Sequence, residues 1–161
     1  MKIVKKFFIY PIQFIIFLKF YYFLRILPNS FASNVGATIF KIVRPLCKAN
    51  QTSIKNLKMV FPNNSTEKIL LKNKKCWQNL GRTIAEFAHL DKITSKNSKH
   101  ITIKGGEHLR TIASEREQAI FIGVHLANWE ILAPIICNFG IKITSVYRHI
   151  NNPLINNFIL D

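Results

Sequence analysis

The longest apolar segment of the chain occupies residues 7–27, close to the N-terminus. This is about the length that a helix needs to cross a bilayer. Lys19 lies inside the segment and Arg25 near its end, and both side chains are long enough to extend their charged groups to the membrane surface. No small-residue cleavage site follows directly, so the segment is not typical of a cleaved signal peptide. We therefore expect residues 1–30 to form a hydrophobic membrane anchor that spans the bilayer or lies in one leaflet; a buried core helix is the alternative.

Residues 31–63 form a second region, in which basic residues accompany apolar ones. The Pro-Asn-Ser sequence at residues 28–30 is expected to end the first helix. Residues 31–47 then form an apolar stretch with two basic residues, which predicts a helix at the membrane surface. The first acidic residue of the chain is Glu67, whereas ten lysines and arginines precede it. This pattern indicates a basic, amphipathic region on an anionic membrane surface.

From residue 64 the pattern changes to that of a soluble domain. Asn64 and Glu67 resemble a capping box, which predicts that a helix begins here and continues to about residue 89. Apolar residues recur along this helix at spacings of three, four and seven, which predicts one buried stripe. The stripe comprises Leu70, Trp77, Leu80, Ile84 and Phe87.

The remaining sequence alternates between strand-like and helix-like segments. Residues 119–124 are a continuous apolar run, as in a buried parallel strand, while residues 100–105 and 141–147 also have the pattern of strands. Residues 107–117 and 129–139 are predicted to be helical. This order predicts an α/β fold for residues 64–161, with a parallel or mixed sheet and flanking helices.

Composition narrows the classes of protein that fit these elements. Of the 161 residues 48% are hydrophobic, so the chain is not a disordered basic tail, and its net charge of +15 requires an anionic partner. A nucleic-acid-binding module is disfavoured, because the aromatic residues concentrate in the apolar anchor instead of alternating with Lys and Arg. The three cysteines are widely spaced and form no CxxC pair, which indicates reduced core thiols and no metal site.

The candidate chemistry lies in residues 121–130, FIGVHLANWE. His125 follows the predicted buried strand and precedes a predicted helix, at the carboxyl edge of the sheet where sites of α/β proteins cluster. Residues five apart on one helix diverge by about 140°, so His125 and Glu130 can pair only across a turn. Asn128 is a suitable N-cap, which places Glu130 in the first helical turn. A carboxylate there can orient the imidazole and leave its other nitrogen free as a base. A simple helix-terminal acid is the alternative interpretation of Glu130.

Five sequence blocks together resemble the late acyltransferases of lipid A biosynthesis, the lauroyl and myristoyl acyltransferases. They occur in that family's order and cover essentially the whole chain. In this sequence they are NLKMVFP (56–62), NLGRTIAE (79–86), IKGGEHL (103–109), GVHLANWE (123–130) and VYRHINNP (146–153). Glu130 and the Asn-Trp before it favour this family over glycerolipid acyltransferases, which usually carry Asp at that position.

The resemblance implies a reaction and a location. A fatty acyl group would move from acyl carrier protein to a hydroxyl of a lipid A precursor, without a cofactor, at the cytoplasmic side of the cell inner membrane. His125 would be the general base and Glu130 its supporting carboxylate. Arg148 and Asn128 would bind substrate, Arg148 through phosphate groups. Glu86 matches a family acid and equally suits a structural role on its helix. Membrane lipids are the other expected partners, and nucleic acid is not one.

This sequence departs from the family pattern at Ala127, where the family usually has Gly, and at His149, where it usually has Pro. Family members are also considerably longer, so the resemblance implies an N-terminal part of such an enzyme, inactive or nearly so without the remainder. The competing interpretation is a catalytically inactive, membrane-associated remnant or interaction protein.

Overall fold

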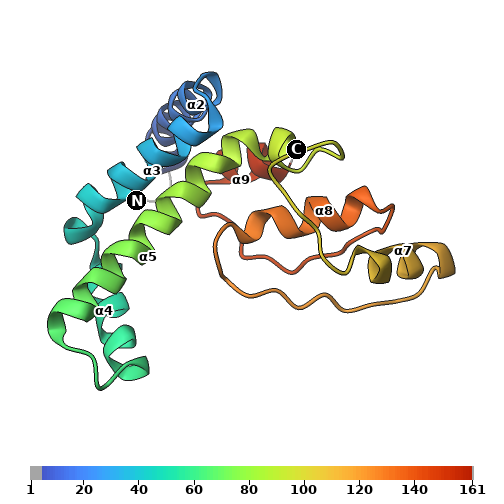
Figure 1. Cartoon of the computed structure of the whole chain (residues 1–161). Coiled ribbons are helices and arrows are strands. Elements are labelled where there is room, and N and C mark those ends of the chain that lie inside the picture. Colours follow the sequence, from blue (N-terminus) through green and yellow to red (C-terminus); the bar gives the residue numbers. More distant parts are fainter. Residues whose placement is uncertain (1–4, 161) are drawn as a thin grey trace.

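The computed structural model describes residues 5–160, and every regular element in that range is a helix (Figure 1). The long helix α5 runs alongside α3, while α7, α8 and α9 belong to a part of the chain with long loops (Figure 1). The elements are η1 (Lys5–Ile9), α2 (Tyr10–Ile26), α3 (Asn29–Val43), η2 (Arg44–Leu46), α4 (Lys48–Val60), α5 (Thr66–Glu86), η3 (Phe87–His89), α6 (Leu90–Ile93), α7 (Gly106–Glu115), η4 (Trp129–Ile131), α8 (Leu132–Asn138) and α9 (Pro153–Leu160).

The N-terminal helical segment Lys6–Ile26 is long and apolar enough to cross a membrane. It is the one helix with this property among residues 5–160, and very little of it is buried. Its packed face meets α9, where the rings of Phe14, Phe17 and Tyr21 surround Phe158 at centroid distances of 6.2, 5.5 and 5.1 Å. The segment ends where the sequence predicts a break, because Pro28 is the N-cap of α3.

The C-terminal end of α2 is attached to the region just after α5. Arg25 donates a hydrogen bond from Nη1 to the backbone oxygen of Ala88 at 2.7 Å, and its guanidinium forms a two-pronged ion pair with Asp91. The buried ring of His89 is hydrogen-bonded through Nε2 to the backbone oxygen of Leu24 at 2.9 Å. These contacts fix the apolar helix to the rest of the chain at one end.

Helices α3 and α5 form the closest packing in the molecule. Gly36 of α3 and Gly81 of α5 are in backbone contact, and the Phe40 ring lies 6.3 Å from the Trp77 ring one turn further along. Five of the six buried residues along α5 follow a spacing of four, and Thr83 is the sixth. The five include small and polar side chains as well as apolar ones: Ile69, Asn73, Trp77, Gly81 and Ala85. Small residues allow two helix backbones to approach closely.

The apolar stripe predicted for α5 is therefore wrong, because it is not the side of the helix that is buried. Trp77 is buried as expected, but Leu70 and Ile84 are exposed, because the helix presents its glycine and alanine positions to α3. The predicted helix start is also shifted by one residue, since Ser65 is the N-cap and accepts a hydrogen bond from the backbone N–H of Lys68.

The predicted α/β fold is wrong, because residues 5–160 contain no β-strand and no sheet. Residues 100–105, 119–124 and 141–147 have no regular secondary structure. A strand requires a neighbouring backbone for its hydrogen-bond ladder, and an apolar pattern alone does not supply one. The side chains of Ile120 and Ile122 are 91% and 90% exposed, so the run that was expected to be buried is at the surface. The helices predicted at 107–117 and 129–139 are confirmed as α7 and as η4 with α8.

Candidate active site

The turn that contains His125 is held against α5 by its backbone. The carbonyl oxygen of Ala127 accepts hydrogen bonds from Asn79 Nδ2 at 3.0 Å and from Thr83 Oγ1 at 3.1 Å. Ala127 has a φ of 48°, in the left-handed region that residues with a side chain seldom adopt. The two donors on α5 stabilise this conformation and place the turn on the side of the long helix.

Asn128 lies at the centre of a chain of hydrogen bonds that leads from the turn to α3. Its Nδ2 donates to Glu86 Oε2 at 2.9 Å, and its Oδ1 accepts from the backbone N–H of Glu130 at 3.1 Å. Ser33 Oγ donates to the other carboxylate oxygen, Oε1 of Glu86, at 2.6 Å. Asn128 is thus the N-cap of η4, as the sequence predicts, and both ends of its side-chain amide are occupied by protein groups.

Glu130 is in the first turn of η4, as predicted, whereas the predicted position of His125 at the end of a strand is wrong. The structure does not bring the two side chains together: no hydrogen bond or ion pair between them occurs in the described part of the chain. His125 packs its ring against Trp129, with centroids 5.1 Å apart. Both His125 and Glu130 are exposed.

His125 and Glu130 line two different hollows, and Trp129 belongs to both. The hollow of His125 has a volume of about 580 Å³ and is otherwise mainly apolar, with Ile103 and Leu132 in its lining. The hollow of Glu130 has a volume of about 420 Å³ and lies between α2, α5 and the segment around residue 148. The indole of Trp129 therefore connects the two candidate residues.

The second hollow combines an apolar wall with two charged groups, and we call it the α2 cavity. From α2 its lining includes Phe17, Phe20, Tyr21 and Leu24. Glu130 and Arg148 are its charged lining residues. An apolar slot that carries a carboxylate and a guanidinium can hold a hydrocarbon chain and the polar group attached to it.

The structure adds three α5 residues and one α3 residue to the predicted set. Asn79, Thr83 and Glu86 contact the turn directly, and Ser33 contacts Glu86. Of these, the sequence singled out Glu86 only. Among residues 5–160, no group of three or more His, Cys, Asp and Glu side chains is arranged to hold a metal ion.

Comparison with the models of known protein families gave a match. The family model described as bacterial lipid A biosynthesis acyltransferase matches residues 1–161, the whole chain. No curated protein and no solved structure matches the chain.

Proposed function

The chain belongs to the bacterial lipid A biosynthesis acyltransferase family, and we propose that it transfers a fatty acyl group from acyl carrier protein to a hydroxyl of a lipid A precursor. The structural observation that supports this proposal best is the α2 cavity. It joins the apolar helix near the N-terminus to Glu130 and Arg148 in a single hollow. Each methylene group of an acyl chain that enters such a cavity contributes about 0.8 kcal/mol.

In the proposed reaction His125 is the general base. Its imidazole removes the proton from the acceptor hydroxyl as the oxygen attacks the thioester carbon, and the carbon–sulfur bond breaks to release the carrier thiolate. The imidazolium then returns a proton to that thiolate. Attack is direct, so the proposal requires no Ser or Cys nucleophile. The exposed position of His125 leaves its ring accessible to a substrate hydroxyl.

We assign Glu130 to the support of the imidazolium that forms during the reaction. The side chains of His125 and Glu130 line two hollows that share Trp129, and the assignment requires them to come within hydrogen-bonding distance of each other when substrate binds. Catalytic hydrogen bonds often become short only in the complex with substrate. Asn128, predicted to bind substrate, is instead supported as a positioning residue by its contacts with Glu86 and Glu130.

Arg148 is the candidate anion-binding residue of the site. It lines the α2 cavity beside Glu130, and a guanidinium is well suited to phosphate oxygens. We propose that it binds a phosphate of the lipid acceptor or of the carrier's phosphopantetheine arm. The apolar segment Lys6–Ile26 supports a location at the inner membrane, with the site on the cytoplasmic side where acyl carrier protein is available.

The proposal is tested with the full chain in detergent micelles, supplied with acyl-carrier thioester and a lipid A precursor. Acylated lipid that accumulates would support the proposal and overturn the expectation that the chain is inactive or nearly so by itself. Arg148→Ala should then raise KM, and Glu130→Gln should lower kcat with little change in KM. Glu117→Gln is the matched control, because Glu117 is an exposed acid outside both hollows. An absence of acyl transfer by the folded, unsubstituted chain would instead support the non-catalytic, membrane-associated interpretation.

A further inference from the structure

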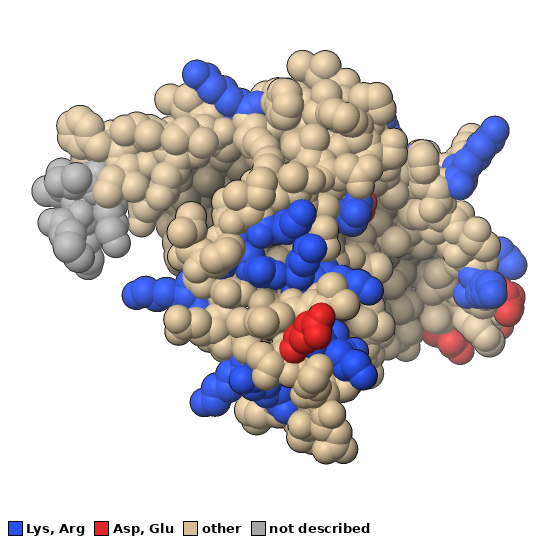
Figure 2. All heavy atoms as spheres, turned by 60° about the vertical axis from the view of Figure 1, so that its left-hand side comes forward, with Lys and Arg blue, Asp and Glu red and all other residues tan. Residues whose placement is uncertain are grey.

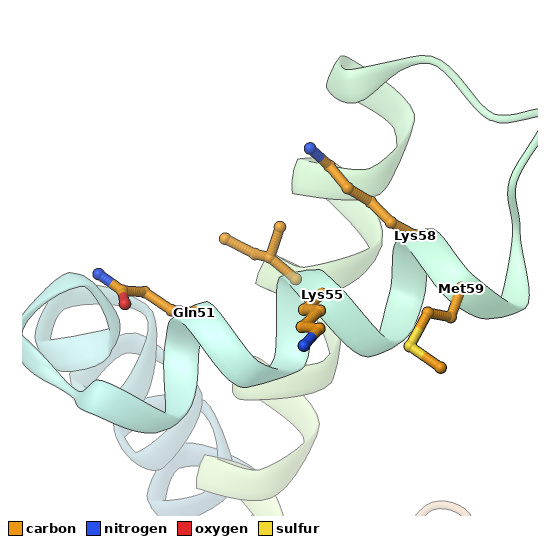
Figure 3. A pocket seen from close by; sticks show the side chains of 5 residues that line it. Gln51, Lys55, Lys58 and Met59 are labelled. Atoms are coloured by element: carbon orange, nitrogen blue, oxygen red, sulfur yellow. The ribbon is translucent and has the colours of Figure 1, made fainter.

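Helix α4 exposes most of its surface, and one side of it carries lysines. Lys48, Gln51, Lys55, Lys58 and Met59 recur at spacings of three, four, three and one, which places them on a single side of an α-helix. All five side chains are exposed. We call this set the lysine stripe. Four of its residues border a shallow hollow together with Ile54 (Figure 3).

The charge around the stripe is strongly unbalanced. Between residues 41 and 75 the sequence has nine lysines and arginines and a single acidic residue, Glu67. Blue side chains far outnumber red ones on the face that includes this part of the molecule (Figure 2). The ion pair found among residues 5–160 joins Arg25 and Asp91, which lie elsewhere, so no acidic side chain in that range forms an ion pair with the lysines of the stripe.

Large apolar side chains stand beside these lysines at both ends of α4. Leu46, in the turn before the helix, is 87% exposed, and Met59 in its last turn is 71% exposed. Val60 and Phe61 continue the exposed apolar positions beyond Met59. Exposed apolar residues that flank a row of cations are typical of helices that lie at the interface of an anionic bilayer.

From these observations we propose that the lysine stripe of α4, together with Leu46 and Met59, docks on the anionic lipid surface of a bilayer as a second membrane contact, separate from α2. Contacts between the lysine ammonium groups and the lipid phosphates would supply the attraction, and the side chains of Leu46 and Met59 would enter the region below the headgroups. The candidate spanning segment Lys6–Ile26 belongs to the same chain, so its insertion into a bilayer would bring α4 near the lipid surface and give its contact a high effective concentration.

A lipid surface fits the stripe better than a protein or nucleic-acid partner. Lysine is depleted at protein–protein interfaces, yet three lysines dominate this side of α4. Single-stranded nucleic acid is bound with aromatic side chains that stack on bases, and the lysine stripe has none. The proposal does not depend on acyl transfer, and it can hold whether or not the chain is catalytic.

The test is a lysine-acetylation footprint of the full chain in lipid nanodiscs, read by mass spectrometry. In discs that contain phosphatidylglycerol, we expect acetylation of Lys55 and Lys58 to slow several-fold relative to discs of phosphatidylcholine alone. Lys104 and Lys142 are internal controls, because both are exposed and lie outside α4: Lys104 precedes α7 and Lys142 follows α8 in the chain. Their labelling should be the same in both kinds of disc.

A variant series separates charge from folding. In anionic discs, the double variant Lys55→Gln/Lys58→Gln should restore rapid acetylation of Lys48. Each lysine near such a surface contributes about 1 kcal/mol, so the loss of two lysines weakens the contact roughly 30-fold. Arg110→Gln/Lys142→Gln is the charge-matched control and should leave the footprint unchanged. Equal labelling of Lys55 and Lys58 in both discs would overturn the proposal, as would shielding that appears only when acyl carrier protein or a DNA duplex is added.

Discussion

Alanine in place of Gly81 tests the packing on which the candidate active site rests. Within an α-helix, Gly→Ala ordinarily stabilises by about 0.5–1 kcal/mol, because alanine loses less conformational entropy on folding. At Gly81 the new Cβ would contact the carbonyl oxygen of Gly36 and lie 2.7 Å from its carbonyl carbon and 2.8 Å from Phe40 Cβ. Two of these atoms are backbone and cannot rotate away, so α3 and α5 must move apart.

Overpacking costs about 1–3 kcal/mol. All three neighbours of the new Cβ lie closer than 3.0 Å and two of them are backbone atoms, so Gly81→Ala belongs to the upper part of this range, and its net cost after the gain in helix propensity is about 1–2 kcal/mol. We expect Gly81→Ala to lower Tm by about 2–8 °C, given that 1 kcal/mol corresponds to about 2–4 °C for a chain of this size. Thermal unfolding in detergent, followed by circular dichroism, measures this difference. Gly106→Ala is the matched control, because its Cβ would meet neighbours only at ordinary contact distances of 3.4 Å and more. A Gly81→Ala protein that melts at or above the wild-type Tm would refute the close α3–α5 packing.

Two further substitutions test the contacts that surround the site. Glu86→Ala removes the hydrogen-bond acceptor of both Ser33 and Asn128. It should lower the free energy of unfolding, measured by chemical denaturation, by about 2 kcal/mol and lower kcat about tenfold. Lys75→Ala, on the exposed side of α5, should change neither quantity. The hydrogen bond from Arg25 holds the pKa of Asp91 below its ordinary value of 3.8, so the stability that this pair contributes is present above pH 4 and is lost as the pH falls through the folded pKa. In the Asp91→Asn protein this loss of stability at acidic pH should be absent. The loss is at most about 1 kcal/mol, because the pair is partly exposed. A pH profile of Tm that is the same in the wild-type and Asp91→Asn proteins would contradict the assignment.

Much of the helical structure could be predicted from the sequence, because it depends on local signals. The break at Pro28, the helix α7 and the cap at Asn128 all follow from the conformational preferences of a few neighbouring residues. The apolar run at residues 119–124 predicted a buried strand, but strand formation depends on a partner backbone that a local pattern does not reveal. No strand forms at residues 119–124, and the side chains of Ile120 and Ile122 are exposed.

The contacts of the site could be predicted only in part. The spacing of His125, Asn128 and Glu130 indicated a turn followed by a helical N-cap, and that arrangement is present. The attachment of the turn to α5 could not be predicted, because the contacts between Ala127 and Thr83 and between Asn128 and Glu86 join residues more than 40 positions apart. The burial of Gly81 instead of Leu70 likewise depends on the approach of α3.

The most direct test of the proposed function is the rate of acyl transfer by the His125→Ala protein. General-base catalysis contributes about 10²–10⁴-fold, so this substitution should remove nearly all turnover while the circular dichroism spectrum and membrane association remain unchanged. His108→Ala is the matched control, because His108 is an exposed histidine on α7 outside both hollows, and it should retain wild-type activity. Full acyl transfer by the His125→Ala protein would contradict the proposed mechanism.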